Sequence, residues 1–595
     1  MGESAHAGRV GTEDEAPWEM SSRLRASPGV WFRTLSHLEW SQIYGQVWHR
    51  ARLAMASRLR SNSTLGDPPS PACRWSPRAR FLGSSANVDG DALVRGEFEF
   101  LNRSARLGWP PRWDADVSSR LWHYNLHYFD FLWVLPFDQG RMVVLDWIAW
   151  NRKMGQGLEA YPTSLRVMNW CGYFFADQAE FTEKAPVLRD VLWASLFDQL
   201  EWLGRHVETH LRGNHVLENA AALALGGSCF EGAHARSWLH DGMALLEKEL
   251  SEQVLADGGH FERSPMYHLR LLWVLTALFN VGTSELQRLV EGPLRRAMDA
   301  GRRLVHPDGD CALLNDSAHG VYPRFGQLEN WWTDVAGEPR SETRWGAFAL
   351  MDTGYYGAAH ANGDYLICDA GPVGPDYQPG HAHGDIFSFE LSLGGQRVIC
   401  DAGVHGYEGD ALRPWCRSTR AHNTVEIEGL DQCEFWSVFR VGARGRPRDV
   451  RFEVTSEGFR LSGWHDGYLR LPQRARHWRE FVWDEERGLG VRDRVESEVP
   501  TRSVSRLHLH PDCRIVDRDD ELVEVAHSEG IFWVAFAGRG KLDIERTLGC
   551  PEFGLARESQ SLVYHRHVAG DITSFFVTKR SREDARSFSQ SLLSS

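Results

Sequence analysis

Hydrophobic positions recur at helical spacing through the first half of the chain, from about residue 31 to residue 332. The loops between these segments are rich in Gly, Pro and Asn, and no fixed sequence period relates one segment to the next. Segment 187–211 shows the pattern best, with one apolar stripe formed by Leu188, Leu192, Leu196, Leu200 and Leu203. We predict further helices over 220–225, 235–255, 267–279 and 284–305. This series of helices favours an α/α toroid.

The hydrophobic period changes to two after about residue 340. Runs such as DYLICDAG, FSFELSLGGQRVICDAG and FWVAFAG have the length of strands and are separated by turn residues. We therefore predict an α+β multidomain protein, with an N-terminal (α/α) toroid followed by a C-terminal antiparallel β-sandwich. The predicted bounds are a tail at 1–30, the toroid at 31–340 and the β-sheet domain at 341–595. A site built from both halves would lie in the cleft between them.

Length and charge narrow the class of protein. A chain of 595 residues is too long for one ordinary core, which agrees with two large domains. The net charge of -14 argues against a nucleic-acid binder and against a protein of anionic membranes, because such partners select basic surfaces. The ten cysteines are scattered without a CxxC pair and are predicted to be buried thiols. The N-terminus lacks the apolar run of a signal peptide, so we expect a cytoplasmic protein, with secretion by another route left open.

Two polar clusters lie where predicted helices begin. RGNHVLENA contains Asn214 and His215, and DGGHFERSPMYH contains Tyr267. Each has an ordinary structural interpretation: Asn214 is a suitable N-cap residue, and a tyrosine in such a place often packs half-buried. The residues alone leave both interpretations open.

A third cluster begins at GHAHGDIFSFEL, where His381 and His383 are followed by Asp385. His383, Asp401 and His422 lie on three successive segments, and two imidazoles with one carboxylate suit a divalent ion such as zinc. The spacing contains no compact ligand motif. Hydrogen-bonded histidines within the sandwich therefore remain the alternative at this point.

A fourth cluster combines aromatic and polar residues in YNLHYFD and YPTSLRVMNW. Aromatic rings stack on sugar faces, while amides and guanidinium groups hold hydroxyls and carboxylates. Arginines near the other clusters offer bidentate contacts to a carboxylate or sulfate. The predicted substrate-binding residues are Asn125, His127, Arg166, Asn169, Arg263, Arg417 and Arg420.

Several of these motifs together resemble the heparinase II/III-like polysaccharide lyases, a group that includes related alginate lyases. The motifs GNHVLENAAAL, GGHFERSPMYH, LLNDS, GHAHGDIFSFEL, VICDAG and RSTRAHNTVEI occur in the order seen in that family. The resemblance runs from about Trp122 to Glu426. It implies an (α/α) toroid followed by antiparallel sheets, and a bacterial lyase that cleaves uronic-acid-containing polysaccharide by β-elimination.

The resemblance also implies roles for single residues. Hydrogen-bond donors must neutralise the uronate carboxylate before a base removes the C5 proton and an acid protonates the departing O4. Asn214 and His215 resemble the carboxylate-facing donors, and Tyr267 resembles the residue that protonates O4 and can also act as base. His381 resembles the alternative base for the opposite C5 epimer, or else a residue that helps to neutralise the carboxylate.

The same resemblance implies a metal site. His383, Asp401 and His422 resemble the ligands of a divalent ion, zinc ahead of manganese, that supports the loops beside the cleft and orients His381 without touching substrate. Asp385 is then left as a structural turn residue.

The partner expected from the resemblance is an anionic uronate polysaccharide, with glycosaminoglycans such as hyaluronan, chondroitin sulfate and heparan sulfate or heparin ahead of alginate or a bacterial exopolysaccharide. A glycoside hydrolase would need two carboxylates facing one cleft, and no such pair is evident in the motifs. A carbohydrate-binding protein without activity is the remaining alternative. The oligomeric state stays undetermined by the sequence.

Overall fold

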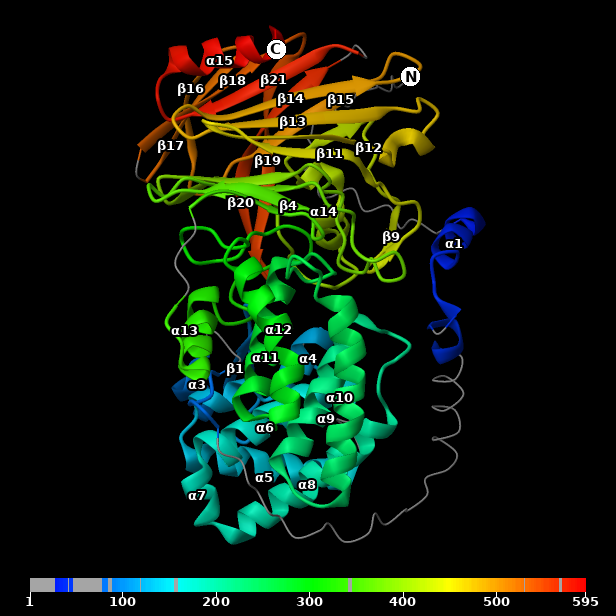
Figure 1. The fold of residues 1–595 in the computed structure, drawn as a ribbon, viewed down its shortest axis with the longest axis vertical. Coiled ribbons are helices and arrows are strands. Elements are labelled where there is room, and N and C mark those ends of the chain that lie inside the picture. The colour runs from blue at the N-terminus through cyan, green and yellow to red at the C-terminus, as the bar shows by residue number, and fades with distance from the viewer. Residues whose placement is uncertain are drawn as a thin grey trace, which may run out of the picture.

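The structure is a computed structural model that describes residues 27–40, 42–46, 77–83, 88–117, 119–154, 159–340, 345–528, 530–566 and 570–594. Most of the predicted tail at 1–30 lies outside the described residues. In the described part, a helical domain is followed by a domain of antiparallel sheets, as predicted (Figure 1). No described helix has the length and apolar character needed to cross a membrane.

Antiparallel helix pairs build the first domain. α9 lies at its centre and packs against α6, α8, α10 and α11. The predicted stripe of α8 is buried from Leu188 to Leu203, because these leucines face the neighbouring helices. The helices are α3 (Gly90–Val94), α4 (Arg120–Tyr128), α5 (Phe137–Met154), α6 (Ala160–Gly172), α7 (Ala179–Glu183), α8 (Pro186–Arg205), α9 (Gly213–Cys229), α10 (Ala233–Gln253), α11 (Pro265–Val281), α12 (Ser284–Gly301) and α13 (Phe325–Ala336).

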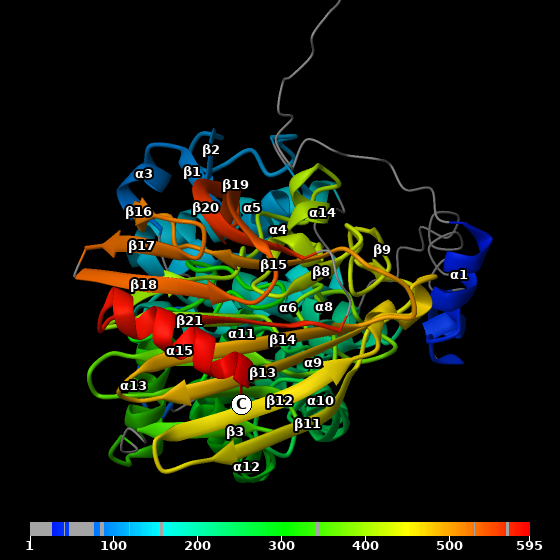
Figure 2. The same cartoon turned by 90° about the horizontal axis from the view of Figure 1, so that it is seen from above.

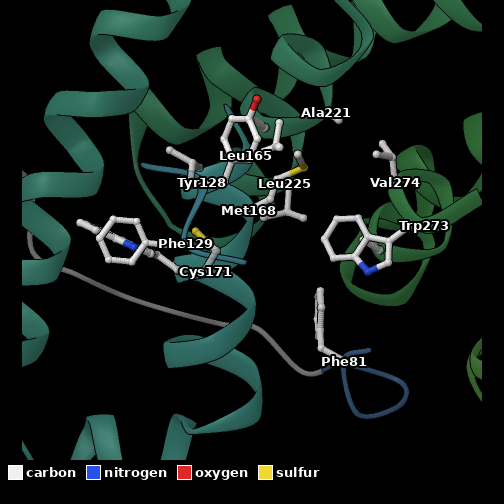
Figure 3. Packing of buried hydrophobic residues seen from close by; sticks show 14 of the residues in the cluster. Phe81, Tyr128, Phe129, Leu165, Met168, Cys171, Ala221, Leu225, Trp273 and Val274 are labelled. Carbon is white, nitrogen blue, oxygen red and sulfur yellow. The ribbon is translucent and has the colours of Figure 1, made fainter. Parts of the chain in front are cut away.

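Large side chains from several helices fill the core of this domain. Phe129 from the end of α4 packs near Cys171 of α6, while Trp273 of α11 lies opposite (Figure 3). Phe129 and Trp170 meet edge to face, with ring centroids 5.2 Å apart. A hairpin of β1 (Glu97–Phe100) and β2 (Arg103–Arg106) adds further aromatic side chains to this core.

Three large antiparallel sheets, with a small two-stranded sheet of β9 (Phe435–Ser437) and β10 (Arg440–Val441), form the described part of the second domain. The first follows the order β3 (Gly346–Leu350), β4 (Tyr355–Ala359), β5 (Tyr365–Asp369), β6 (Phe389–Leu393) and β7 (Gln396–Ile399). The second has eight strands in the order β11 (Pro447–Val454), β12 (Gly458–His465), β13 (Arg476–Asp484), β14 (Gly488–Glu496), β21 (Ile572–Thr578), β18 (Gly530–Ala537), β17 (Leu522–His527) and β16 (Arg514–Arg518). The third has the order β19 (Lys541–Glu552), β20 (Leu555–Arg566), β15 (Ser503–His508) and β8 (Val425–Ile427).

The sheets pack face to face through aromatic side chains. Phe389 of β6 lies against Phe481 of β13 and Phe575 of β21, with ring centroids 5.7 Å and 6.2 Å away. The C-terminal helix α15 (Arg582–Ser594) covers the outer face of the eight-stranded sheet (Figure 2). The predicted sandwich is therefore present. The helix α15 was not predicted, because its sequence is largely polar.

The first described helix departs from the predicted domain bounds. α1 (Pro28–Leu35) crosses the predicted boundary between the tail and the toroid, yet it packs beside β9 (Phe435–Ser437) and β10 (Arg440–Val441) of the sheet domain (Figure 1). Arg33 donates to both carboxylate oxygens of Glu434, at 2.8 Å and 2.6 Å. This placement depends on contacts between residues about 400 positions apart in sequence, and helical periodicity contains no information on such contacts.

Candidate active site

A groove of about 1100 Å³ lies between the two domains. Asn214, His215 and Tyr267 line it from the helical domain, and His381 lines it from the sheet domain. The structure therefore brings together all four residues that were predicted to be catalytic. Several aromatic side chains give the groove an apolar lining, among them Tyr124, Tyr161, Trp202, Tyr322, Tyr407 and Phe439.

Asn214 and His215 occupy the first turn of α9. Arg212 and Gly213 just before them have positive φ angles of 62° and 59°, so the chain turns sharply into the helix. The positive φ favours glycine at position 213, and a Cβ there would lie 2.3 Å from Oε1 of Glu262 and would displace that carboxylate. Within the described residues, no hydrogen bond occupies the side-chain amide of Asn214, which leaves it available to a ligand in the groove.

His215 is prepared to carry positive charge. Its Nδ1 lies 3.0 Å from Oε2 of Glu208, and its ring packs against Tyr161 with centroids 4.4 Å apart. Burial lowers the pKa of His215, but the Glu208 carboxylate outweighs that effect, so the pKa is raised. A protonated imidazole beside the Asn214 amide suits an anionic ligand group.

Tyr267 lies in the first turn of α11. Ser264 caps the helix by accepting the backbone N–H of Tyr267 at 3.2 Å, and Pro265 occupies the first turn. The phenol oxygen lies 3.0 Å from that of Tyr407. Burial, and then the neighbouring Tyr407, raise the pKa of Tyr267 well above that of a free tyrosine. At neutral pH the side chain is therefore a phenol that can donate a proton.

A buried carboxylate organises both histidines of the GHAHGD stretch. Oδ2 of Asp316 lies 2.8 Å from Nδ1 of His381, and its Oδ1 lies 2.8 Å from Nε2 of His383. Both guanidinium NH groups of Arg413 also donate to this carboxylate. Burial alone would raise the pKa of Asp316, but Arg413 and the two histidines hold it well below its usual range.

An ionised Asp316 accepts hydrogen bonds and cannot donate them, so each imidazole presents an N–H to it. His381 then carries its proton on Nδ1 and keeps a lone pair on Nε2. His383 carries its proton on Nε2 and keeps a lone pair on Nδ1. One carboxylate thus gives neighbouring histidines opposite tautomers, the first suited to a base and the second to a metal ligand.

The helices that carry Asn214 and Tyr267 are joined by a buried ion pair. Arg270 of α11 donates to both oxygens of Glu218 in α9, at 2.6 Å and 2.9 Å. The two side chains are only 4% and 2% exposed. Because Glu218 lies one turn after Asn214 and Arg270 one turn after Tyr267, this pair fixes the spacing of the two helix starts.

His383, Asp401 and His422 converge as predicted for a metal site. All three are buried, and each can offer a ligand atom within 4.8 Å of the others. Among the described residues, Nδ1 of His383 and Nε2 of His422 are buried and have no hydrogen-bond partner, as expected of atoms that bind a metal ion. This donor set fits a divalent ion of the zinc type.

The pKa values of the two histidines also agree with a bound divalent ion. Burial lowers the pKa of His383 to about 3. Burial also acts to lower the pKa of His422, but Asp401, whose oxygens lie 2.8 Å and 2.9 Å from its Nδ1, raises it to about 9. A cation bound at Nε2 would replace the proton that His422 otherwise carries. Asp385 accepts the backbone N–H of Asn315 at 3.1 Å and lies in a turn, in keeping with its predicted structural role.

Three residues predicted to bind substrate lie in the helical core instead. Arg166 is fully buried and donates to Gln199 at 2.7 Å and to the carbonyl of His127 at 3.1 Å. Asn169 is 1% exposed and donates to the carbonyl of Tyr128. His127, Arg166 and Asn169 do not line the groove. The prediction was wrong for these three because their polar groups hold the α4–α6 packing.

The predicted arginines of the sheet region also have structural partners. Arg263 donates to the carbonyls of Phe261, Thr353 and Asp352, and Arg417 donates to those of Ala382 and Ser437. Arg420 pairs with Glu545 at 2.8 Å. None of the three arginines lines the groove, so the structure does not support them as substrate contacts. Asn125 does line it.

Sequence reasoning missed Asp316, Glu262 and Tyr407. The first two belong to the quoted motifs LLNDS and GGHFERSPMYH, but nothing in the sequence indicates which member of a motif contacts which histidine. Burial raises the pKa of Glu262, whose Oε2 lies 3.6 Å from Nε2 of His381.

Among the described residues that line the groove, arginines and carboxylates nearly balance. The arginines are Arg120, Arg440 and Arg444, and the carboxylates are Asp130, Glu159, Glu208 and Glu408. Beside Asn214, the contact of His215 with Glu208 raises the pKa of the imidazole and so favours its charged form.

Comparisons with known proteins agree on one family. Residues 174–333 match the family described as Heparinase II/III N-terminus, and residues 342–588 match the family described as Heparinase II/III-like, C-terminal. A crystal structure of heparinase III has a similar fold, with a TM-score of 0.65, 18% identity and coverage of 94% of each chain.

Two curated relatives differ in how much of the chain they match. A heparin-sulfate lyase of Pedobacter heparinus is 26% identical over 261 residues, which span 39% of this chain and 38% of the relative. The chain therefore matches less than half the length of that lyase. The FtsZ-localized protein C of Caulobacter vibrioides is 25% identical over 525 residues, which span 81% of this chain and 86% of the relative.

Proposed function

The chain belongs to the heparinase II/III-like family, and from this membership we propose that it is a polysaccharide lyase that cleaves uronic-acid-containing polysaccharide by β-elimination. The observation that carries the proposal is the meeting of Asn214, His215, Tyr267 and His381 in one interdomain groove. Glycosaminoglycans are the favoured substrates, ahead of alginate, because the lyase relatives are named for heparin-sulfate.

In the proposed mechanism, Asn214 and His215 bind the uronate carboxylate. The Asn214 amide donates a hydrogen bond and the His215 imidazolium supplies charge, which together stabilise the enolate-like intermediate. The positive charge on His215 is supported by its contact with Glu208. Without such neutralisation the C5 proton is too weakly acidic to be removed.

Proton transfer is assigned to His381 and Tyr267. Nε2 of His381 accepts the C5 proton, since Nδ1 is held by Asp316. Tyr267 donates its phenol proton to O4 as the C4–O4 bond breaks, a role supported by its raised pKa. The rings of the two residues lie 4.3 Å apart, close enough to act on neighbouring substrate atoms. Asn125 is the remaining predicted substrate contact.

We further propose that His383, Asp401 and His422 hold a divalent ion, with zinc preferred and manganese as the alternative. A bound ion would cross-link the segments that follow β5, β7 and α14 (Leu412–Arg417). Its support would reach His381 through His383 and Asp316, so no step of the reaction passes through the metal itself.

Incubation with hyaluronan, chondroitin sulfate, heparan sulfate and alginate tests the function. A lyase produces an ultraviolet absorbance from the new C4=C5 double bond. Reducing ends without this absorbance would identify a hydrolase. Binding without any product would favour the second candidate, a carbohydrate-binding protein. This candidate is retained because the relative with the long match, FtsZ-localized protein C, is not named as a lyase.

Elemental analysis tests the metal proposal. We expect about one divalent ion per chain in the parent protein and a strong reduction in His383→Ala. His127→Ala is the control, because His127 is also a buried histidine but lies in the helical core, where its Nδ1 accepts the indole N–H of Trp147. Equal metal content in the parent and His383→Ala would contradict the site.

A further inference from the structure

Residues 27–40 and 42–46, here called the N-terminal strap, connect the two domains beside the groove. On the sheet domain, Arg33 forms its bidentate pair with Glu434. Thr34 accepts the indole N–H of Trp436 at 3.0 Å, and Trp31 packs on the same indole with ring centroids 4.6 Å apart. These contacts fix α1 to the edge of the sheet domain.

The later part of the strap is attached at the start of α9. Glu39 pairs with Arg212, two residues before Asn214. Gln42 donates to the carbonyl of Tyr377 at 3.2 Å. A Cβ added to Gly45 would lie 2.7 Å from the Cβ of His210, which shows how closely the strap approaches the helical domain. The strap is therefore attached on both sides of the interdomain groove.

One side of the strap faces the groove. Four residues of the strap recur every four positions and line the groove: Thr34, Leu38, Gln42 and Gln46. Asn214 and His215 line the same groove. The opposite side is exposed to solvent and includes Phe32, Trp40 and Tyr44, which are 74%, 75% and 71% exposed. The strap thus lines the groove and spans the gap between the two domains at that place.

We propose that the strap closes one end of the groove, so that the enzyme acts from the ends of its polysaccharide and not within the chain. This inference rests on the proposed lyase function and adds the mode of attack. Internal cleavage needs a groove open at both ends, because the polymer continues in both directions from the cut bond. A segment attached to both domains blocks one of these directions, and only a chain end can then reach His381 and Tyr267.

The strap can be released without disturbing the catalytic residues. Its Arg33–Glu434 pair is partly exposed, at 45% and 25%, and so contributes little to overall stability. Arg33→Glu places two like charges together and should free α1. Arg33→Glu with Glu434→Arg restores opposite charges and should return the strap to its place. Glu39→Arg opposes Arg212 and releases the other attachment independently.

The measurement is the fall in mean polymer mass for each double bond formed. The substrate is the high-mass polysaccharide of the panel that gives the largest absorbance, with mass followed by size-exclusion chromatography. We expect the parent enzyme to release short unsaturated products while the polymer mass falls slowly. In Arg33→Glu and in Glu39→Arg the mass should fall several-fold more for each double bond, and the charge-swapped pair should behave like the parent.

Arg586→Glu is the matched control, because it reverses another exposed arginine, which lies on α15, pairs with Asp519 and is far from the groove. The inference is overturned if the parent lowers polymer mass steeply from the first double bonds, or if both released variants keep the parent ratio. Absence of absorbance on every polymer would instead refute the lyase function, and the inference with it.

Discussion

At the scale of single residues, the hydroxyl of Tyr267 has the most direct predicted effect. Tyr267→Phe should lower kcat by about 10²–10⁴-fold, because the acid that protonates O4 is lost. The ring remains, so the thermal unfolding midpoint should change little. Initial rates of double-bond formation and a thermal melt provide the measurements.

Tyr407→Phe separates the acid from its hydrogen bond. It removes the 3.0 Å contact between the two phenols but keeps the hydroxyl of Tyr267. We expect a much smaller loss of kcat than in Tyr267→Phe. Equal losses would mean that the phenol pair, and not Tyr267 alone, matters for turnover.

Asp316 should affect both the base and the metal ligands. Asp316→Asn should lower kcat by about 10–100-fold and also lower metal content, because it orients His381 and His383 without contacting substrate. KM should stay close to that of the parent protein. Kinetic constants and elemental analysis are measured on the same preparation.

His381→Ala provides the comparison, since it should lose kcat and keep the metal. If Asp316→Asn retained full metal content and full kcat, the opposite tautomers assigned to the two histidines would be incorrect.

Residue types and motif order predicted which four residues meet in the groove and which three form the proposed metal site, but not the contacts between them. The opposite roles of His381 and His383 follow from Asp316, which lies 65 residues earlier in the chain. Arg166 shows the converse error. Its polar and aromatic neighbours in the sequence resembled a sugar-binding site. The burial of its side chain excludes contact with substrate, and burial cannot be seen in a sequence.

At the scale of elements, the Arg270–Glu218 pair determines how α9 and α11 are held together. Glu218→Ala should destabilise the helical domain by about 3–5 kcal/mol, because it leaves a buried guanidinium without its partner. The change is measured as a shift of the urea unfolding transition of that domain.

The double variant Glu218→Leu with Arg270→Met is the control. It removes both charges and should recover much of the lost stability. A single variant as stable as the parent would show that the pair contributes no net attraction.

Periodicity predicted elements best where one face is buried against a neighbour. The leucines of α8 and the alternating strands of the sandwich satisfy this condition. α15 did not, since only Ala585, Ser589 and Leu592 of its residues are buried. α1 was assigned to the wrong domain because its position depends on Glu434 and Trp436, distant in sequence.

At the scale of the whole molecule, net charge should govern encounter with the substrate. The protein carries a net charge of -14, and the groove lining is nearly neutral, so a polyanion is repelled at long range. Raising ionic strength from about 10 mM to about 150 mM shortens the Debye length from about 30 Å to about 8 Å and should increase kcat/KM. Initial rates at low substrate concentration measure this effect.

The value of kcat at saturation should change little over the same range and serves as the internal control. A steady fall of kcat/KM with added salt would instead indicate a strongly basic binding surface outside the groove lining.

The strap has a consequence for how successive cuts are made. A groove closed at one end has a single opening, and the polymer that remains after a cut occupies it. The small fragment held at the closed end can leave only after that polymer has dissociated. Each cleavage is then followed by complete release of the substrate. The enzyme would work distributively, visiting many chains once, rather than processively along one chain.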